Sequence, residues 1–198
     1  MTAKISPTSQ RTQARIIDAV VETVATHGIS GTTLANVAAA AGVSQGVLIF
    51  HFKTKEGLLT ETLRRLSDEY RKAWEPALAA PDPLDRILGL VRADFGASVC
   101  TRKKLALWFA FWGEAGAEPL YNRICEEAEQ IRYAAMVGAC EALNGGPDPV
   151  LLANSIDAMT DGLWLQMHIY GRTVSRADAF DKALGHLRLL LPDHAARI

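Results

Sequence analysis

The chain has 198 residues, of which 49% are hydrophobic and 22% are charged. This length allows one large domain or a small domain joined to a medium-sized one, and the composition excludes a disordered chain because it supplies enough apolar surface for a core. Lys and Arg number 21 and Asp and Glu number 22, so the net charge of −1 gives no overall attraction to nucleic acid or to an anionic membrane.

The charges are nevertheless uneven along the chain. Residues 1–55 carry five basic and two acidic side chains, a charge of +3, and the remaining 16 basic and 20 acidic side chains give −4. A mildly basic N-terminal part therefore precedes an acidic body, and only the N-terminal part is a candidate for an anionic partner.

Three further features concern cell compartment and cofactors. Cys100, Cys125 and Cys140 are odd in number and lack a C-x-x-C spacing, which favours reduced thiols over disulfides or a zinc site. The polar residues 1–13 lack the apolar core of a secretory signal, and no run of about 18 apolar residues could span a membrane. We expect a cytoplasmic protein with no membrane partner, no metal and no cofactor.

Apolar residues recur at helical spacing along nearly the whole chain, and strand-like alternation is absent, which predicts an all-α fold of about nine helices. The first helix is expected over residues 8–27, with Gly28 ending it in a left-handed conformation. Thr33 is placed to cap a helix over residues 34–40, and Ser44 to cap another over residues 45–52.

Later helices begin with the same kinds of signal. Thr54 is expected to cap a helix over residues 55–79, with a kink or fraying at Pro76. Further helices are expected over residues 83–99 and 149–170, each after an Asp-Pro pair, with one after Thr101 and one over residues 119–143 closed by residues 144–146. Ser175 and Asp178 form a capping box for a last helix that reaches Leu191 and ends at Pro192.

Residues 33–55 read TLANVAAAAGVSQGVLIFHFKTK, which predicts a helix-turn-helix. Small alanines let the two helices cross closely, and Gly42 supplies the turn between them. Leu48 and Phe52 lie four residues apart on the face that must pack inward, so Gln45, Ile49 and Phe50 point elsewhere. In a major groove Ile49 could contact a thymine methyl group and Gln45 could pair with adenine. Lys53 and Lys55 follow the second helix, where DNA phosphates would lie.

Two alternatives compete with this interpretation. An alanine-rich segment broken by glycine also occurs in helical bundles that bind no DNA. Residues 42–46 also spell G-x-S-x-G, but that motif makes a nucleophile only when a strand precedes the serine, and here a helix does. Ser44 is therefore expected to be a cap, the five histidines show no metal-ligand spacing, and no catalytic residue is predicted.

The stretch TTLANVAAAAGVSQGVLIFHFKTKEGLL, residues 32–59, resembles the TetR family of transcriptional regulators. The resemblance implies a DNA-binding domain over residues 1–55 and a ligand-binding and dimerising domain over residues 56–198. It implies phosphate contacts by Thr33, Ser44 and Lys55, and a reading helix that carries Gln45, Gly46, Val47 and Phe50. Ala35 stands where the family often has arginine and Ile49 where it often has tyrosine, so His51 becomes the candidate for the aromatic phosphate contact.

The second domain contains a candidate ligand site. Residues 105–121 read LALWFAFWGEAGAEPLY, and residues 161–171 read DGLWLQMHIYG. Aromatic faces with carboxylates can hold an organic cation, although aromatic stripes of this kind also form ordinary core. These stretches, with PLYNRI, resemble the TetR subgroup typified by the choline-responsive repressor of glycine betaine synthesis. The candidate ligand residues are Trp108, Phe111, Trp112, Glu114, Tyr121, Trp164 and His168.

A second copy of the chain is the remaining expected partner. One helix-turn-helix buries too little surface for a tight, specific complex, so a two-fold dimer is expected, with the last two long helices as its interface. The same apolar residues could instead close the core of a single copy. The candidate interface residues are Ile156, Met159, Thr160, Leu163, Met167, Ala183, Leu187 and Leu190.

Taken together, the sequence predicts a homodimeric repressor that binds a double-stranded palindromic operator and is released by a small molecule, with an organic cation such as choline as a candidate. A helical-bundle enzyme or an adaptor that has lost DNA binding stays open as the alternative, because Ala35 replaces the usual arginine and the N-terminal charge is only +3.

Overall fold

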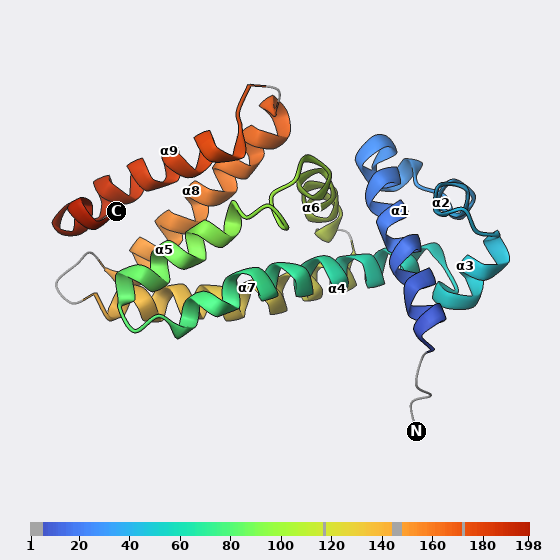
Figure 1. Ribbon diagram of the computed structural model, residues 1–198, viewed down its shortest axis with the longest axis horizontal. Helices are drawn as coiled ribbons and strands as arrows, with labels where there is room; N and C mark the ends of the chain where they lie inside the picture. The colour runs from blue at the N-terminus through green and yellow to red at the C-terminus, as the bar shows by residue number, and fades with distance from the viewer. Residues whose placement is uncertain (1–5, 117, 144–147, 172) are drawn as a thin grey trace. The chain divides into compact units, whose positions relative to one another are not determined.

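The computed structural model describes residues 6–116, 118–143, 148–171 and 173–198. Over these residues the chain forms nine α-helices and two short 3-10 helices, with no strand among them, which confirms the all-α fold (Figure 1). The α-helices are α1 (Pro7–Gly31), α2 (Leu34–Ala41), α3 (Gln45–Phe52), α4 (Lys55–Trp74), α5 (Pro83–Asp94), α6 (Arg102–Ala115), α7 (Pro119–Glu141), α8 (Pro149–Tyr170) and α9 (Arg176–Leu190), and the 3-10 helices are η1 (Glu75–Ala79) and η2 (Pro192–Arg197).

The chain folds into two compact units. The first contains residues 1–66 and 106–122, and the second contains residues 67–105 and 123–198. The predicted domain boundary lies between residues 55 and 56, whereas the first unit continues to residue 66. The two differ because α4 runs unbroken from Lys55 to Trp74 and belongs to both units. A boundary between a DNA-binding and a ligand-binding domain at residue 55 stays a prediction.

In the first unit, α1 packs on α2 and α2 on α3. Gly42 joins α2 to α3 in the left-handed conformation, with φ of 62° and ψ of 39°, and the two helices are bent by 109° relative to each other. This is the turn and crossing angle of a helix-turn-helix. The side chains of Ile16, Val20 and Leu48 are fully buried in the core of this unit.

Several predicted helix ends are confirmed and others are wrong. The predicted break at Gly28 is present, since Gly28 is non-helical with a positive φ of 68°, but its ψ of 175° is extended and not left-handed. A further short helical segment follows this kink, so α1 as a whole runs to Gly31. Helix α5 stops at Asp94 and not at residue 99, because the N–H groups of Phe95 and Gly96 turn back to the carbonyls of Arg92 and Ala93. Pro76 does mark a break, since α4 gives way to η1 there.

The C-terminal helices follow their predicted starts more closely. Helices α5 and α8 begin after the aspartate caps Asp82 and Asp148, and α9 begins with the complete Ser175–Asp178 capping box. Helix α7 ends at Glu141, two residues earlier than expected, and the predicted stop at residues 144–146 lies outside the described residues. The short helix η2 after Pro192 was not predicted.

In the second unit, α5 lies against η1 and α8, and α8 packs on α9. The unit buries Leu84, Ile87 and Ile156 completely. Its three thiols, Cys100, Cys125 and Cys140, are free and buried, and burial raises the pKa of each to about 11.

Within the described ranges, no single helix has both the length and the apolar character needed to cross a membrane. Only the bent pair of α2 and α3 passes that test when the two are taken together.

Candidate DNA-binding surface and ligand site

The N-terminal end of α3 is open to an approaching partner. Ser44 caps the helix by accepting a hydrogen bond from the N–H group of Val47, with a distance of 3.3 Å between nitrogen and Oγ. Gln45 and Gly46, the first two residues of the helix, are exposed, and Gly46 has no side chain to obstruct a close approach. This helix end has the size and accessibility that entry into a major groove requires.

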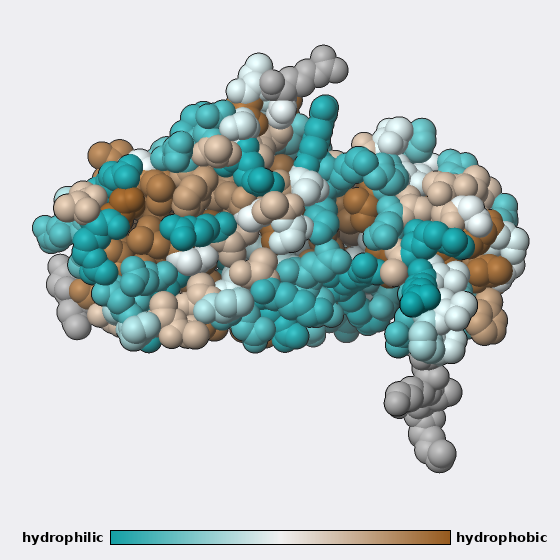
Figure 2. Space-filling model, viewed as in Figure 1, coloured by the Kyte–Doolittle hydropathy of each residue, from teal (hydrophilic) through white to brown (hydrophobic). Residues whose placement is uncertain are grey.

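The two faces of α3 separate as the four-residue spacing predicts. Leu48 and Phe52 are buried, whereas the side chains of Val47, Ile49 and Phe50 are 38%, 44% and 71% exposed. Figure 2 shows hydrophobic residues at the surface at the right-hand end of the view, where α3 lies in Figure 1. The outward face is therefore apolar, and a contact between such a face and base edges would be chiefly with thymine methyl groups.

Lys53 follows α3 in a strained backbone conformation. Its φ is 67° and its ψ is −58°, and the Thr54 N–H group donates to the Phe52 carbonyl at 2.8 Å, which closes a three-residue γ-turn of the rare positive-φ form. The exposed Lys53 ammonium group donates to the Phe50 carbonyl at 3.0 Å and lies 5.5 Å from the Phe50 ring centroid. These two contacts hold the positive charge of Lys53 at the C-terminal end of the exposed face of α3.

Lys55 has a different role from Lys53. Its half-buried ammonium group donates to the Ile29 carbonyl at 2.8 Å, which ties the start of α4 to the end of α1. Thr33, a further candidate phosphate contact, is exposed and caps α2 through the Asn36 N–H group at 3.1 Å. His51 is half-buried in the last turn of α3, with its ring 5.2 Å from that of Phe50.

The candidate ligand residues are divided between the two units. Trp108, Phe111, Trp112, Glu114 and Tyr121 belong to the first unit, and Trp164 and His168 to the second. In the first unit, the Trp108 and Trp112 rings are 6.1 Å apart, and the Phe111 and Tyr121 rings meet edge to face at 5.2 Å. Trp108, Phe111 and Tyr121 are buried, whereas Trp112 and Glu114 are half-buried.

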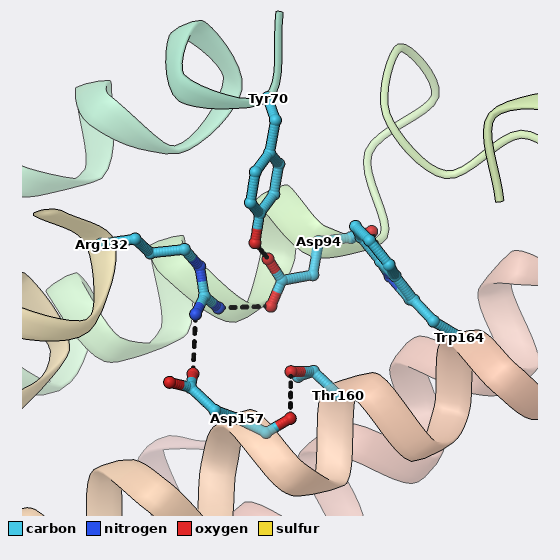
Figure 3. A network of polar contacts seen from close by, with 6 residues as sticks. All are labelled: Tyr70, Asp94, Arg132, Asp157, Thr160 and Trp164. Carbon is cyan, nitrogen blue, oxygen red and sulfur yellow. Dashed lines mark hydrogen bonds and ion pairs between the residues drawn. The ribbon is translucent and has the colours of Figure 1, made fainter. Parts of the chain in front are cut away.

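In the second unit Trp164 belongs to a buried polar network, shown in Figure 3. The Tyr70 hydroxyl donates to one carboxylate oxygen of Asp94 at 2.6 Å, and Arg132 donates to the other at 2.6 Å. The second terminal nitrogen of Arg132 binds Asp157 at 2.6 Å, and Trp164 donates from Nε1 to the Asp94 backbone carbonyl at 2.9 Å. The network connects α4, α5, α7 and α8 within this unit.

The network has more negative than positive charge. The Arg132 guanidinium group is 3% exposed and pairs with both Asp94 and Asp157. Burial raises the pKa of the nearby half-buried Glu129 to about 7, helped by the Asp161, Asp157 and Asp94 carboxylates and opposed by Arg132. Arg132 also lies 5.9 Å from the Tyr70 ring centroid. The carboxylates around Arg132 therefore outnumber the one guanidinium group, and the region favours a positive charge. It already holds one cation, that of Arg132, beside an aromatic ring.

Sequence reasoning missed this network. Tyr70, Asp94 and Arg132 are distant in the chain, so no local spacing joins them. One signal was available, because Asp94 continues the apolar series Ile87, Leu90 and Val91 on one face of α5, and a carboxylate in that place needs a buried partner.

Most of the candidate interface residues of α8 and α9 face the core of their own chain. Met159 and Leu190 are half-buried, and the others are buried. The buried residues are Ile156, Thr160, Leu163, Met167, Ala183 and Leu187. Apolar periodicity marks a packed face without saying what it packs against. These residues pack within one copy of the chain, and their contact with a second copy stays a prediction.

A second apolar stripe of α8 is exposed, and so is one leucine of α9. On α8, Leu151, Leu165 and Ile169 are 62%, 44% and 57% exposed, and Leu189 on α9 is 81% exposed. A side chain added at Gly162 of α8 would meet nothing within 4 Å. The stripe is thus both apolar and open at its middle.

No cluster of three or more metal-ligating side chains occurs in the part of the chain that the structure describes.

Comparisons with known proteins agree with an N-terminal helix-turn-helix followed by a second helical part. Residues 16–62 match the model of the bacterial regulatory proteins of the tetR family, and residues 83–192 match that of the BetI-type transcriptional repressor C-terminal domain. An HTH-type transcriptional regulator BetI from Paraburkholderia phymatum is 32% identical, with 93% of this chain and 95% of the relative covered. A protein of the same name from Burkholderia thailandensis is 31% identical, with 92% and 95% covered.

Solved structures share the fold. A putative transcriptional regulator from Pseudomonas aeruginosa PAO1 superposes with a TM-score of 0.78 at 24% identity, covering 98% of this chain and 96% of that one. A putative transcriptional regulator from Saccharomonospora viridis, solved in complex with choline, superposes with a TM-score of 0.75 at 21% identity, covering 88% and 94%.

These names describe transcriptional regulators and no enzyme. With the helix-turn-helix on its first helices and a BetI-type repressor domain over more than half of its length, the chain belongs to the tetR family of DNA-binding transcriptional regulators.

Proposed function

We propose that this regulator binds a palindromic operator as a homodimer in the cytoplasm and represses transcription until an organic cation such as choline binds to it. The observation that carries the DNA-binding part is the exposed apolar face of α3, supported from below by the buried Leu48 and Phe52. Exposed apolar surface lowers the solubility of a protein, so a face of this kind indicates a binding partner.

In this proposal the exposed face reads bases and its surroundings hold the backbone. Gln45, Ile49 and Phe50 contact base edges, with Gly46 and Val47 allowing the close approach. Thr33, Ser44, His51 and Lys53 contact phosphates, and Lys55 positions the start of α4 through Ile29 as well as adding charge. Few of these residues are basic, so we expect a shallower salt dependence of binding than for a basic reading helix.

The dimer part of the proposal uses the exposed stripe of α8 and the exposed leucine of α9. Leu151, Leu165, Ile169 and Leu189 would meet their counterparts around a two-fold axis, and Gly162 would let two copies of α8 approach closely. A two-fold dimer presents two reading helices to half-sites about 34 to 36 Å apart.

The cation part is supported by charge and by a relative. The Saccharomonospora viridis structure contains choline, and in this chain four carboxylates, those of Asp94, Glu129, Asp157 and Asp161, interact with Arg132 in a region that also holds Tyr70 and Trp164. His168 of α8 is a further candidate contact in this unit, and the aromatic group of α6 with Glu114 and Tyr121 is a separate candidate in the first unit. Effector binding would shift the separation of the two reading helices in the dimer.

A thymine-methyl test addresses the DNA-binding part. DNA flanking the chain's own gene is titrated by fluorescence anisotropy at about 50 and 200 mM salt, and single thymines of the bound site are replaced by deoxyuridine, which lacks the methyl group. We expect at least one replacement to weaken wild-type binding about fivefold and to leave the binding of Ile49→Ala unchanged. Ile131→Ala, an exposed isoleucine of α7, is the matched control and should behave as wild type. Equal losses in wild type and Ile49→Ala would contradict base reading by Ile49.

The effector is tested separately by thermal unfolding with choline, betaine aldehyde and 3,3-dimethylbutanol, the neutral analogue of choline. A ligand that binds only the folded state raises the melting temperature, so we expect stabilisation by a cation and none by the neutral analogue. Stabilisation by no cation, or equally by the neutral analogue, would contradict the cation part and leave the DNA-binding part standing.

A further inference from the structure

A concavity in the second unit lies outside everything proposed so far. It lies between the end of α5 and the start of α9 and has a volume of about 460 Å³. That volume is within the range of small-molecule sites. Its walls are formed by Arg92, Phe95, Gly96, Ser175, Arg176, Ala177 and Phe180.

The concavity is positively charged. Arg92 and Arg176 are its only ionisable lining residues, and neither forms an ion pair with any of the described carboxylates. The nearby Asp178 is already engaged, since it accepts hydrogen bonds from the Ser175 hydroxyl at 2.7 Å and from the Ser175 N–H group at 3.1 Å, and these bonds hold the pKa of its carboxyl below the usual value. Two unpaired guanidinium groups in an otherwise acidic body favour an anionic ligand.

One wall of the concavity is aromatic. The Phe95 and Phe180 rings are 6.0 Å apart with an angle of 50° between their planes. The Arg92 guanidinium carbon lies 5.8 Å from the Phe180 ring centroid, so the cation and the apolar wall are adjacent. The two tilted rings present an apolar, aromatic surface against which another flat ring can pack.

The backbone adds to the positive field. The N–H groups of Arg176 and Ala177 begin α9 and have no acceptor among the described residues, whereas the Arg92 and Ala93 carbonyls at the end of α5 already accept from Phe95 and Gly96. The start of α9 therefore presents two backbone donors to the concavity, and the positive end of the helix dipole lies there.

From these observations we propose that the concavity binds a small aromatic carboxylate, with the carboxylate between Arg92 and Arg176 and the ring against Phe95 and Phe180. An inorganic anion would leave the two phenyl rings unused, and an organic cation would be repelled by both arginines. The site is thus separate from the proposed cation effector site and does not depend on it.

Calorimetric titration of the full-length protein with benzoate, benzamide and inorganic phosphate tests this proposal. We expect benzoate to bind at least tenfold more tightly than benzamide, its neutral analogue, and more tightly than phosphate. Arg92→Gln and Arg176→Gln should each weaken benzoate binding about fivefold or more, and the double variant should abolish it. Arg188→Gln, an exposed arginine near the other end of α9, is the matched control and should bind as wild type.

Several results would overturn the proposal. These are no benzoate binding, equal binding of benzoate and benzamide, benzoate binding by the double variant as by wild type, and an equal loss in Arg188→Gln. If the two arginine substitutions instead shift the monomer–dimer equilibrium in light scattering and leave benzoate affinity unchanged, the concavity belongs to a contact with a second copy. Circular dichroism of each variant separates loss of the site from loss of the fold.

Discussion

Lys53 and Lys55 are two residues apart and look equivalent in the sequence, yet the structure gives them different tasks. Lys53 is exposed and holds a positive φ, whereas Lys55 is half-buried and bonded to the Ile29 carbonyl. A non-glycine residue in this part of the φ/ψ map costs about 1 to 3 kcal/mol. The strain at Lys53 therefore places a cationic side chain at a position where glycine would be easier to accommodate.

Lys53→Gly should separate the backbone effect from the charge effect. We expect the free energy of unfolding to rise by up to about 1 kcal/mol, because glycine accepts the positive φ, while operator affinity falls with the lost charge. Lys53→Ala is the control, since it loses the charge and keeps the strain. Urea unfolding and anisotropy titration measure the two quantities, and equal stability of the Gly and Ala variants would contradict strain at this position.

Lys55→Met should act mainly on stability. Its ammonium group makes a charge-assisted hydrogen bond that a thioether cannot replace, and we expect a loss of about 1 to 2 kcal/mol in urea unfolding. Lys53→Met should stay within about 0.5 kcal/mol of Lys53→Ala, because its side chain is exposed. A Lys55→Met protein as stable as wild type, with weaker DNA binding, would instead mark Lys55 as a phosphate contact alone.

At the scale of helices, the Asp94–Arg132 pair fastens α5 to α7, and its partners Tyr70, Asp157 and Trp164 extend the connection to α4 and α8. Arg132 and Asp94 are both nearly inaccessible to solvent. A buried pair of this kind is a weak net source of stability, but removing one partner leaves an uncompensated charge.

Arg132→Met is therefore expected to lower the free energy of unfolding by about 3 to 5 kcal/mol. Arg132→Met combined with Asp94→Asn should recover part of that loss, because the buried carboxylate charge is gone as well. The double-mutant cycle is measured by urea unfolding. Strict additivity of the two substitutions would show that the residues do not interact.

Glu129 on α7 gives a pH dependence with a definite sign. Its folded-state pKa of about 7 lies above the ordinary value of 4.5, so the folded chain keeps a proton that the unfolded chain has lost between these values. Stability contributed by this group is present at low pH and is lost as the pH rises from about 4.5 to about 7. The fall should be smaller in Glu129→Gln than in Glu127→Gln, an exposed neighbour, when unfolding free energies are compared across this range. Identical pH profiles would contradict the shift.

The helices were largely predictable from the sequence because their ends carry local chemistry. Thr33, Ser44 and the Ser175–Asp178 box cap the helices that they were expected to cap. The early stop of α5 was missed because its cause is a backbone turn at Phe95, a residue with no turn preference of its own. The inward face of α3 follows from spacing, whereas the partners of Asp94 do not, since contacts between distant segments leave no local pattern.

At the scale of the whole molecule, each chain carries two apolar faces on α8, and only burial distinguishes them. The inner face closes the second unit, and the outer stripe of Leu151, Leu165 and Ile169, with Leu189 of α9, stays exposed. A monomer that kept this stripe in water would be prone to association. The periodicity of α8 could not assign the faces, because both recur at helical spacing.

Leu189→Asp should convert the proposed dimer to a monomer at micromolar concentration, because a carboxylate would face its own copy across an apolar contact. Light scattering after size-exclusion chromatography measures the mass. Ile131→Asp places the same charge on α7 and should leave the dimer intact. A dimeric Leu189→Asp protein, or a wild type that is already monomeric, would contradict this interface.

The three buried thiols have a practical consequence. With pKa values of about 11, only about one in ten thousand of each ionises at neutral pH, so alkylating reagents and mild oxidants should scarcely react with them in the folded state. A single cysteine introduced on the exposed surface of α3 would then be the preferred attachment point for a spin label, without replacement of any native residue. Paired labels in two associated chains would report the distance between their reading helices directly, with and without choline.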